Sequence, residues 1–235
     1  SACGRSKQWQ QALSVLRQQW RANFEPNARS YNSGISACAK GEQWQQVLSL
    51  FREMWDSTLT PNVVSYSLGI SGCNGGGQWQ HALYLFSRMF DAKFELDIIA
   101  YSAGISACET GLQWQQALSM LSHSREATVK SDVIMYTATI SSCEKCGQWE
   151  QALLLLRDLL TLGLELDAVI YNAAMSACGK GDQWRHGLLL FGELCESRLE
   201  PDVVSYNAGI SVCEKGTQWE RAIVLFSEMR EASLK

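Results

Sequence analysis

The sequence has no apolar run that approaches the ~18 residues of a membrane span, so no membrane partner is expected. It also lacks an excess of positive charge, because its formal net charge is -4. This balance counts against binding to nucleic acid through phosphates alone, and by itself it favours a protein or peptide partner. Binding through one locally basic or neutral face remains open.

No group of residues suggests catalysis or metal binding. Cys143 and Cys146 have C-x-x-C spacing, but the second cysteine or histidine pair of a zinc site does not follow. The run Asn74–Gly77 is rich in glycine, but the G-K-[ST] of a phosphate-binding loop is missing. We therefore predict no enzymatic activity, no cofactor and no metal ion.

The chain also opens without a methionine, a signal peptide or a transit peptide. It begins at Ser1, in the middle of a repeated unit, and it ends at Lys235, just short of a unit's end. We expect it to be a piece of a longer array, with any targeting segment outside it.

What is present is a unit of 35 residues that recurs without insertion or deletion. Tryptophan keeps this step at Trp9, Trp44, Trp79, Trp114, Trp149, Trp184 and Trp219. Cysteine keeps it at Cys3, Cys38, Cys73, Cys108, Cys143, Cys178 and Cys213, and tyrosine at Tyr31, Tyr66, Tyr101, Tyr136, Tyr171 and Tyr206. An unbroken period of this length predicts a stacked repeat array, so function is expected where the copies differ.

Each unit is taken to begin three residues before its tyrosine. Five complete copies then span 28–62, 63–97, 98–132, 133–167 and 168–202. A partial copy, 1–27, precedes them, and a nearly complete copy, 203–235, follows. The whole chain is thus expected to be one continuous array.

Each copy carries the patterns of two helices. In the last copy Tyr206, Ile210 and Cys213 form an apolar stripe that ends near Lys215 and Gly216. A second stripe of about three turns begins at Trp219. The pair predicts a helical hairpin, and seven hairpins are expected to stack into an all-α solenoid.

The periodic cysteines and glycines are interpreted through this stacking. Equivalent residues on stacked helices lie about 8–10 Å apart, beyond the Cα separation of about 7 Å that a disulfide bridges. The cysteines are therefore expected to be reduced residues of the apolar seam, in a reducing compartment. First helices contain Gly34, Gly69, Gly104 and Gly209, at a cost of ~1 kcal/mol each. Either neighbouring helices approach closely there, or the array tolerates them.

The motifs identify a family. A 35-residue period, V-x-Y-N at the start, A-L-x-L-F-x-x-M in the second helix and P-D at the join resemble the pentatricopeptide repeat family over essentially the whole chain. Tetratricopeptide repeats differ, because their period is 34 and their tryptophan lies in the first helix. The resemblance implies a right-handed α-solenoid of stacked helix-turn-helix hairpins that binds single-stranded RNA, one base per repeat, with the RNA 5′ end toward the protein N-terminus.

In this family the base is read by the residue after the tyrosine and by the last residue of the same repeat. We call these the reader and the closing residue. The resemblance assigns the pairs Asn32/Asn62, Ser67/Asp97, Ser102/Asp132, Thr137/Asp167 and Asn172/Asp202, with Asn207 as the first half of a sixth. The reader lies about 100° around the helix from the buried stripe and varies only among asparagine, serine and threonine, which agrees with this assignment. The alternative is that these residues are helix caps and solvated turns.

The chemistry of the pairs predicts the bases. An ionised aspartate only accepts hydrogen bonds, so it should prefer uracil or guanine, which carry a donor on the Watson–Crick edge. A short hydroxyl beside it leaves room for a purine, whereas an asparagine favours a pyrimidine. The predicted core is 5′-(C/U)GGGU-3′.

Two further positions are predicted to support the bases and the phosphates. The residue two before the tyrosine would sandwich a base: Arg29, Val64, Ile99, Ile134, Val169 and Val204. The family places a phosphate contact at the end of the first helix, which here carries Lys40, Lys145, Lys180 and Lys215. Glu109, Glu144 and Glu214 precede three such positions and would offset part of the charge. The lysines equally suit the negative end of the helix dipole.

The sequence therefore predicts a non-catalytic, sequence-specific binder of single-stranded RNA. By family resemblance it would act in organellar RNA processing, stability or translation, in a chloroplast or mitochondrion, with effector proteins recruited through missing segments. The alternative is a protein-binding helical-repeat scaffold without RNA specificity.

Overall fold

The computed structural model describes residues 2–21, 27–57, 59–127, 132–164, 166–197 and 199–232, with side chains in the first helix from residue 9 to residue 18. These residues form thirteen α-helices and no strand. The helices are α1 (Ala2–Arg21), α2 (Ala28–Lys40), α3 (Trp44–Asp56), α4 (Val63–Gly75), α5 (Trp79–Asp91), α6 (Ile98–Thr110), α7 (Trp114–Glu126), α8 (Val133–Lys145), α9 (Trp149–Thr161), α10 (Ala168–Lys180), α11 (Trp184–Glu196), α12 (Val203–Lys215) and α13 (Trp219–Glu231). From α2 onward the predicted hairpin recurs with the predicted period.

The same local signals begin and end these helices in each copy. The first helix starts after an asparagine or aspartate in extended conformation, as at Asn62 and Asp202. It ends before a two-residue turn whose second residue has a positive φ, for example Gly77 (φ 69°) and Thr217 (φ 52°). The second helix then starts at the periodic tryptophan. Caps and turns are local chemistry, which is why the sequence located these boundaries.

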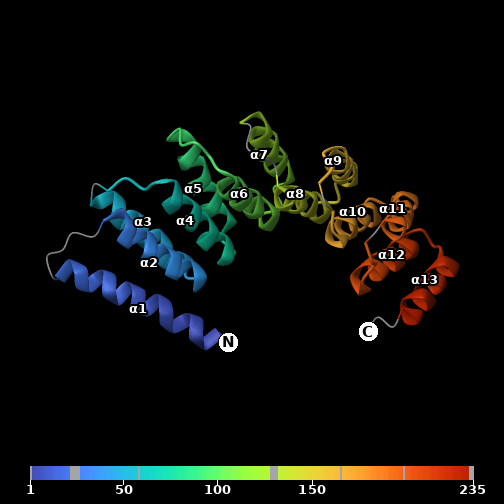
Figure 1. The fold of residues 1–235 in the computed structure, drawn as a ribbon, viewed down its shortest axis with the longest axis horizontal. Coiled ribbons are helices and arrows are strands. Elements are labelled where there is room, and N and C mark those ends of the chain that lie inside the picture. The colour runs from blue at the N-terminus through green and yellow to red at the C-terminus, as the bar shows by residue number, and fades with distance from the viewer. Residues whose placement is uncertain are drawn as a thin grey trace. The chain divides into compact units, whose positions relative to one another are not determined.

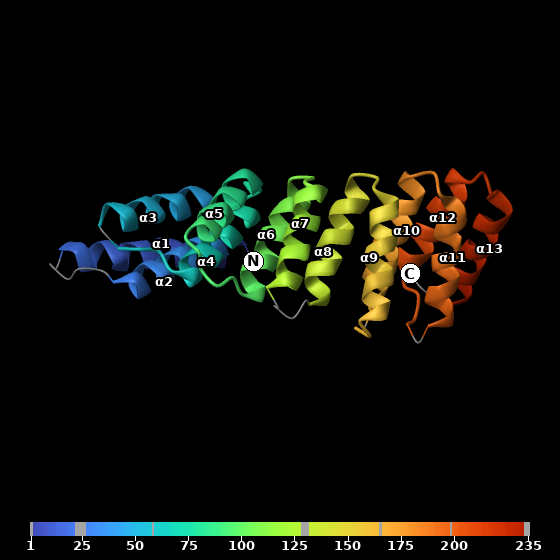
Figure 2. The same ribbon diagram turned by 90° about the horizontal axis from the view of Figure 1, so that it is seen from above.

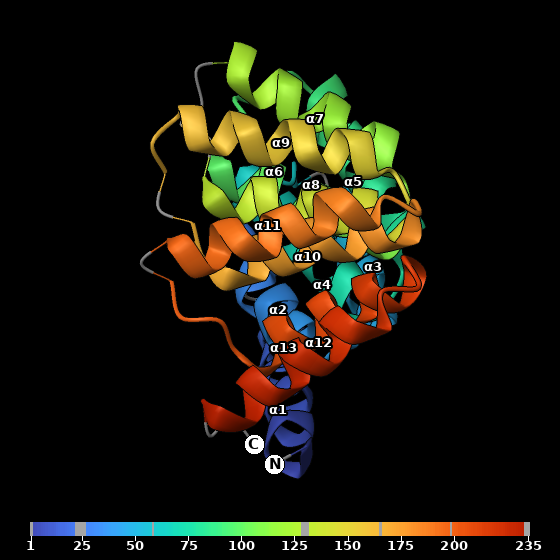
Figure 3. The ribbon, with the colours of Figure 1, turned by 90° about the vertical axis from the view of Figure 1, so that its right-hand side faces the viewer.

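The chain divides into two compact units, each described here by itself. Unit 1 comprises residues 1–111 and 122–130, and unit 2 comprises 112–121 and 131–235. In unit 1 the first helices α2, α4 and α6 pack in succession, and α3 and α5 each lie against two of them (Figure 1). In unit 2 α8, α10 and α12 form the same layer, with α9 and α11 packed across it (Figure 2). Figure 3 views unit 2 from its C-terminal end, with α12 and α13 in front.

The periodic tyrosines and cysteines lie in the core between these layers. Every periodic cysteine from Cys38 to Cys213 is fully buried, and the eight cysteines with described side chains are free. Burial raises the pKa of Cys73 and Cys108 to about 12, so their thiols stay protonated and unreactive. The predicted reduced seam is confirmed for these residues; the side chain of Cys3 lies outside the described part.

The periodic tryptophan packs on the turn of the next copy. A Cβ added at Gly181 would lie 2.2 Å from Trp149, and one added at Gly216 would lie 2.5 Å from Trp184. The glycines inside first helices have a similar reason, since a Cβ at Gly69 would lie 2.4 Å from Phe51 of the preceding copy. Close approach between neighbouring hairpins, and not tolerance, therefore explains Gly69.

The first copy differs from the expectation of seven hairpins. Its residues form one continuous helix, α1, so the described chain holds six hairpins and a single long helix. Ser6 stands where five of the six later copies have the turn glycine on which a tryptophan packs. Cys146 also stands at this position in a later copy, yet α8 and α9 form a hairpin there, so the missing glycine does not by itself explain the continuous helix.

Candidate nucleic-acid interface

The structure brings together the predicted reader and closing residue in two repeats. Asn32 Nδ2 donates a hydrogen bond to Asn62 Oδ1 at 3.3 Å. Asn172 Nδ2 donates to Asp202 Oδ1 at 3.4 Å, across the same interval of 30 residues. The two side chains face one another because each closing residue caps the first helix of the next hairpin, and that helix packs beside the reader's helix.

The closing residues are also helix caps, as the alternative interpretation expected. Oδ1 of Asn62, Asp97 and Asp202 accepts the backbone N–H of the third residue of the following helix, at 2.8–2.9 Å. Asp167 caps α10 in the same way, whereas Asp132 makes no side-chain cap. Capping occupies one oxygen. The other side-chain atom, Oδ2 of an aspartate or Nδ2 of an asparagine, is left to distinguish a ligand, so the two interpretations are compatible.

Several reader side chains have polar atoms without a protein partner. Ser67 Oγ and Asn172 Oδ1 are buried and make no hydrogen bond to any residue that the structure describes. Thr137 is satisfied differently, because its hydroxyl donates to the carbonyl of Val133 within its own helix. Buried polar atoms are usually paired, and the exceptions call for a partner such as water, an ion or a ligand.

Asp202 is held in its ionised form. Burial alone would raise the pKa of this carboxyl, but hydrogen bonds from the Ser205 side chain and backbone and from Asn172 outweigh it and lower the pKa below its ordinary value. The lowered pKa keeps the group charged at neutral and mildly acidic pH. An ionised carboxylate only accepts hydrogen bonds, so this site suits a ligand edge that donates.

The predicted sandwich residues are solvent-exposed. Val64, Ile99, Ile134, Val169 and Val204 are 55–62% exposed, although each is branched and apolar. Each is the second residue of its helix, which is the first helix of a hairpin. This recurring exposure offers branched apolar side chains against which a ligand can make van der Waals contacts.

One groove combines three of the predicted roles. A groove of about 560 Å³ in unit 1 is lined by Arg29, Asn32, Lys40 and Val64, with Ser33, Ser36 and Ala37 between them. It therefore contains a reader, the sandwich positions of two consecutive repeats and a lysine at a helix end. A volume of this size accommodates a nucleobase.

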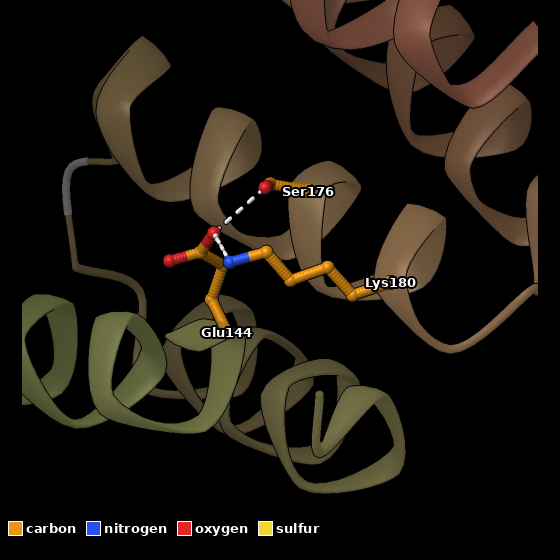
Figure 4. Close-up of polar contacts among 3 residues, drawn as sticks. All are labelled: Glu144, Ser176 and Lys180. Atoms are coloured by element: carbon orange, nitrogen blue, oxygen red, sulfur yellow. Dashed lines mark hydrogen bonds and ion pairs between the residues drawn. The ribbon is translucent and has the colours of Figure 1, made fainter. Parts of the chain in front are cut away.

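The predicted phosphate lysines all lie in the last turn of a first helix, where they also complement the helix dipole. Lys180 is engaged by the preceding repeat: its Nζ lies 2.7 Å from Glu144 Oε1, to which the Ser176 hydroxyl also donates at 2.7 Å (Figure 4). A comparable polar contact joins Thr110 to Asn74 at 2.8 Å. The glutamate therefore offsets directly the charge of a lysine 36 residues further along the chain, a partner that the sequence had not indicated.

Cys146, one half of the C-x-x-C pair, and two histidines have structural roles. Cys146 donates a weak hydrogen bond to the carbonyl of Leu112. His81 lies against Trp44, and His186 stacks on Trp149, with ring centroids 5.6 and 5.7 Å apart. Among the described residues no group of three or more histidine, cysteine, aspartate or glutamate side chains could hold a metal ion, and no helix is long and apolar enough to cross a membrane.

The sequence analysis missed two serines at this interface. Ser65 and Ser205 are fully buried, and each joins its closing residue in a reciprocal capping box. Ser65 Oγ also donates to Asn32 Oδ1 at 2.6 Å. The signal was present, because the residue before the tyrosine is a serine in some repeats (Ser30, Ser65 and Ser205) and apolar in the others (Ala100, Met135 and Ile170).

The fold defines a helical-repeat protein, in which two repeats pair the reader with the closing residue. Family profiles agree: the PPR repeat family matches residues 26–75, the pentatricopeptide repeat domain matches 154–216, and the PPR repeat matches 134–164 and 204–234. The chain belongs to the pentatricopeptide repeat family. No curated protein matches it significantly.

Solved structures show the same fold. The pentatricopeptide repeat protein PPR10 from maize aligns over 99% of this chain with a TM-score of 0.75 and 21% identity. PPR10 in complex with an 18-nt psaJ RNA element aligns over 95% of this chain and 38% of its own length, with a TM-score of 0.56 and 19% identity. The PPR domain of Arabidopsis thaliana protein-only RNase P 1 in complex with tRNA aligns over 71% of this chain and 88% of its own, with a TM-score of 0.62 and 12% identity. The chain spans 33% of the length of the maize protein.

Proposed function

We propose that this protein binds single-stranded RNA, one base per repeat, without catalysing a reaction. The observation that carries the proposal is the pairing of reader and closing residue, with the buried Asn172 Oδ1 left without a partner among the described residues. The solved complexes of PPR10 with an RNA element and of the RNase P 1 PPR domain with tRNA support RNA as the ligand. Each 35-residue copy, bounded as given above, would be one recognition unit.

The identity of each base would follow from the atoms that capping leaves available. At Asp97, Asp132 and Asp167 an acceptor stands beside a short hydroxyl reader, which suits guanine with its donors and its larger ring system. At Asn172/Asp202 the longer reader leaves room for a pyrimidine, and the ionised aspartate favours uracil over cytosine. At Asn32/Asn62 both side chains carry N–H groups, so either pyrimidine is accommodated. The proposed core is 5′-(C/U)GGGU-3′.

The surrounding residues supply affinity that does not depend on sequence. Each base would lie between the sandwich residues of consecutive repeats, as Arg29 and Val64 line one groove. The exposed lysines at helix ends would contact phosphates. By family resemblance the setting would be RNA processing, stability or translation in a chloroplast or mitochondrion, with effector proteins performing any chemistry.

Fluorescence anisotropy with short RNAs tests the proposal. RNAs with a CGGGU or UGGGU core should bind more tightly than the same RNAs with an AAAAA core. Equal binding, or no binding at low salt, would overturn it. In that case docking of a protein would be the better explanation. This second function is favoured by the net charge of -4 and by exposed apolar residues that recur at one position of α9, α11 and α13, namely Leu154, Leu189 and Val224.

The register of the code has its own test. Ser102→Asn gives repeat 98–132 the asparagine–aspartate combination of repeat 168–202. We expect the preferred third base to change from guanine to uracil, with a change in the U/G affinity ratio of about tenfold or more. If the variant still prefers guanine there, or changes its preference at another base, the assignment of repeats to bases is wrong.

A further inference from the structure

The type of the residue immediately before each tyrosine correlates with the type of the reader in the preceding repeat. In the repeats that follow the asparagine readers Asn32 and Asn172, this residue is a serine, Ser65 and Ser205 respectively. In the repeats that follow the serine and threonine readers, this residue is always apolar. It is Ala100 in the repeat after Ser67, Met135 in the repeat after Ser102 and Ile170 in the repeat after Thr137. All five complete pairs obey this division.

In unit 1 the serine is bonded directly to the reader. The fully buried Ser65 Oγ lies 2.6 Å from Asn32 Oδ1 and 2.9 Å from Asn62 Oδ1, and it accepts the Asn62 backbone N–H at 3.2 Å. With its Oδ1 held by Ser65, the Asn32 amide directs Nδ2 toward Asn62. The hydroxyl therefore decides which way the amide faces.

In unit 2 the serine acts through the closing residue. Asp202 Oδ1 accepts from the Ser205 N–H and hydroxyl, both at 2.8 Å, and from Asn172 Nδ2. These three donors converge on one carboxylate oxygen. They turn Oδ2 of Asp202 and Oδ1 of Asn172 away from this contact, and Asn172 Oδ1, which is buried, makes no hydrogen bond to a described residue.

Hydroxyl readers have no such need. No hydrogen bond joins Ser67 to Asp97 or Thr137 to Asp167, because these side chains are shorter and, in Thr137, the hydroxyl is already bonded within its helix. A serine or threonine also has no amide whose two ends must be told apart. An apolar residue before the next tyrosine then serves packing alone.

We propose that the residue before the tyrosine is a third specificity position, at which serine orients the asparagine reader of the preceding repeat. Ser65 and Ser205 are thus positioning residues for pyrimidine recognition and touch no base themselves. This inference rests on the proposed function, since it concerns the same base sites.

Two single variants test it, each serving as the other's control. Ser65→Ala should lower the preference for pyrimidine over adenine at the first base by about 3- to 10-fold and leave the fifth base unchanged. Ser205→Ala should do the reverse, lowering the preference for uracil at the fifth base only. Ser65→Thr and Ser205→Thr, which keep the hydroxyl, should restore the preference.

Ala100→Ser supplies a matched control behind a hydroxyl reader, and it should leave the preference for guanine at the second base unchanged. A uniform loss of affinity for every RNA, parallel to a lower melting temperature, would show that the serines only stabilise the fold and would overturn the inference. So would unchanged base preferences in both alanine variants. If the unmodified protein shows no preference at the first and fifth bases, the proposed function fails instead, before any serine is tested.

Discussion

At Asp202 one carboxylate caps a helix and, under the proposed function, would also recognise a base, with a different oxygen for each role. Oδ1 caps α12 through the Ser205 N–H, while Oδ2 remains for a ligand. An asparagine can also supply the capping oxygen, as Asn62 does before α4, but it carries an NH2 group where aspartate has Oδ2. The closing position can therefore change its recognition chemistry at little cost in stability.

Asp202→Asn should accordingly shift the preferred fifth base from uracil toward cytosine, whose N3 accepts the donor that asparagine offers. We expect the U/C affinity ratio to fall about tenfold, measured by anisotropy, with little change in melting temperature. Asp56→Asn at the end of α3 makes the same change in net charge and should leave the ratio unaltered. An equal effect of the two variants would mean that charge, not base recognition, is responsible.

At the scale of the element, the hairpin turn is the point where consecutive copies meet. The second helix of one copy begins with a tryptophan whose ring packs on the turn of the next copy, where five of the six described turns carry a glycine. At Gly181 an added Cβ would lie 2.2 Å from Trp149 and 2.7 Å from a second atom of that ring. The contact stacks one hairpin on the next.

Gly181→Ala should destabilise unit 2 by about 2 kcal/mol, because the ring must shift in a packed interface. Urea denaturation followed by tryptophan fluorescence measures this loss. Gly192→Ala, in the interior of α11 with no atom within 4 Å of the added Cβ, should be neutral or stabilising by up to about 1 kcal/mol, as expected of alanine in a helix. Equal losses in both variants would contradict the tryptophan contact as the cause.

At the scale of the molecule, an ion pair between neighbouring repeats restrains one of the lysines proposed to contact phosphates. Lys180 faces the candidate interface, but Glu144 of the preceding repeat holds it at 2.7 Å. Such a pair restrains a lysine that would otherwise release counterions on binding RNA. Under the proposed function, this pair would lower the affinity that is independent of sequence and leave more of the discrimination to the reader pairs.

Glu144→Gln should raise affinity for all RNAs alike, by about threefold at low salt, and steepen the dependence of affinity on salt. Glu150→Gln, on the exposed first turn of α9, changes the net charge equally without freeing Lys180 and should have a smaller effect. Anisotropy titrations across a salt series distinguish the two. A similar rise in both variants would assign the effect to overall charge.

Most of the fold was predictable because its causes are local and repeated. Extended asparagine or aspartate caps, turn glycines and apolar stripes lie within a few residues of the boundaries they specify, and the period displays each of them several times. The first copy was the exception. There the pattern predicted a hairpin, but the residues form one continuous helix, α1.

The sequence by itself determined the repeat period, the all-helical hairpin, the reduced cysteine seam and the positions at which the copies differ, because these features follow from residue spacing along one chain. Only the tertiary structure decided what lies across the gap between copies: that Asn172 reaches Asp202, that Ser65 orients Asn32, that Glu144 holds Lys180 and that Trp149 covers Gly181. These partners are separated by 30 to 36 residues and meet through side-chain reach and packing. Such contacts have no signature in local spacing, so they became visible only once the hairpins were stacked.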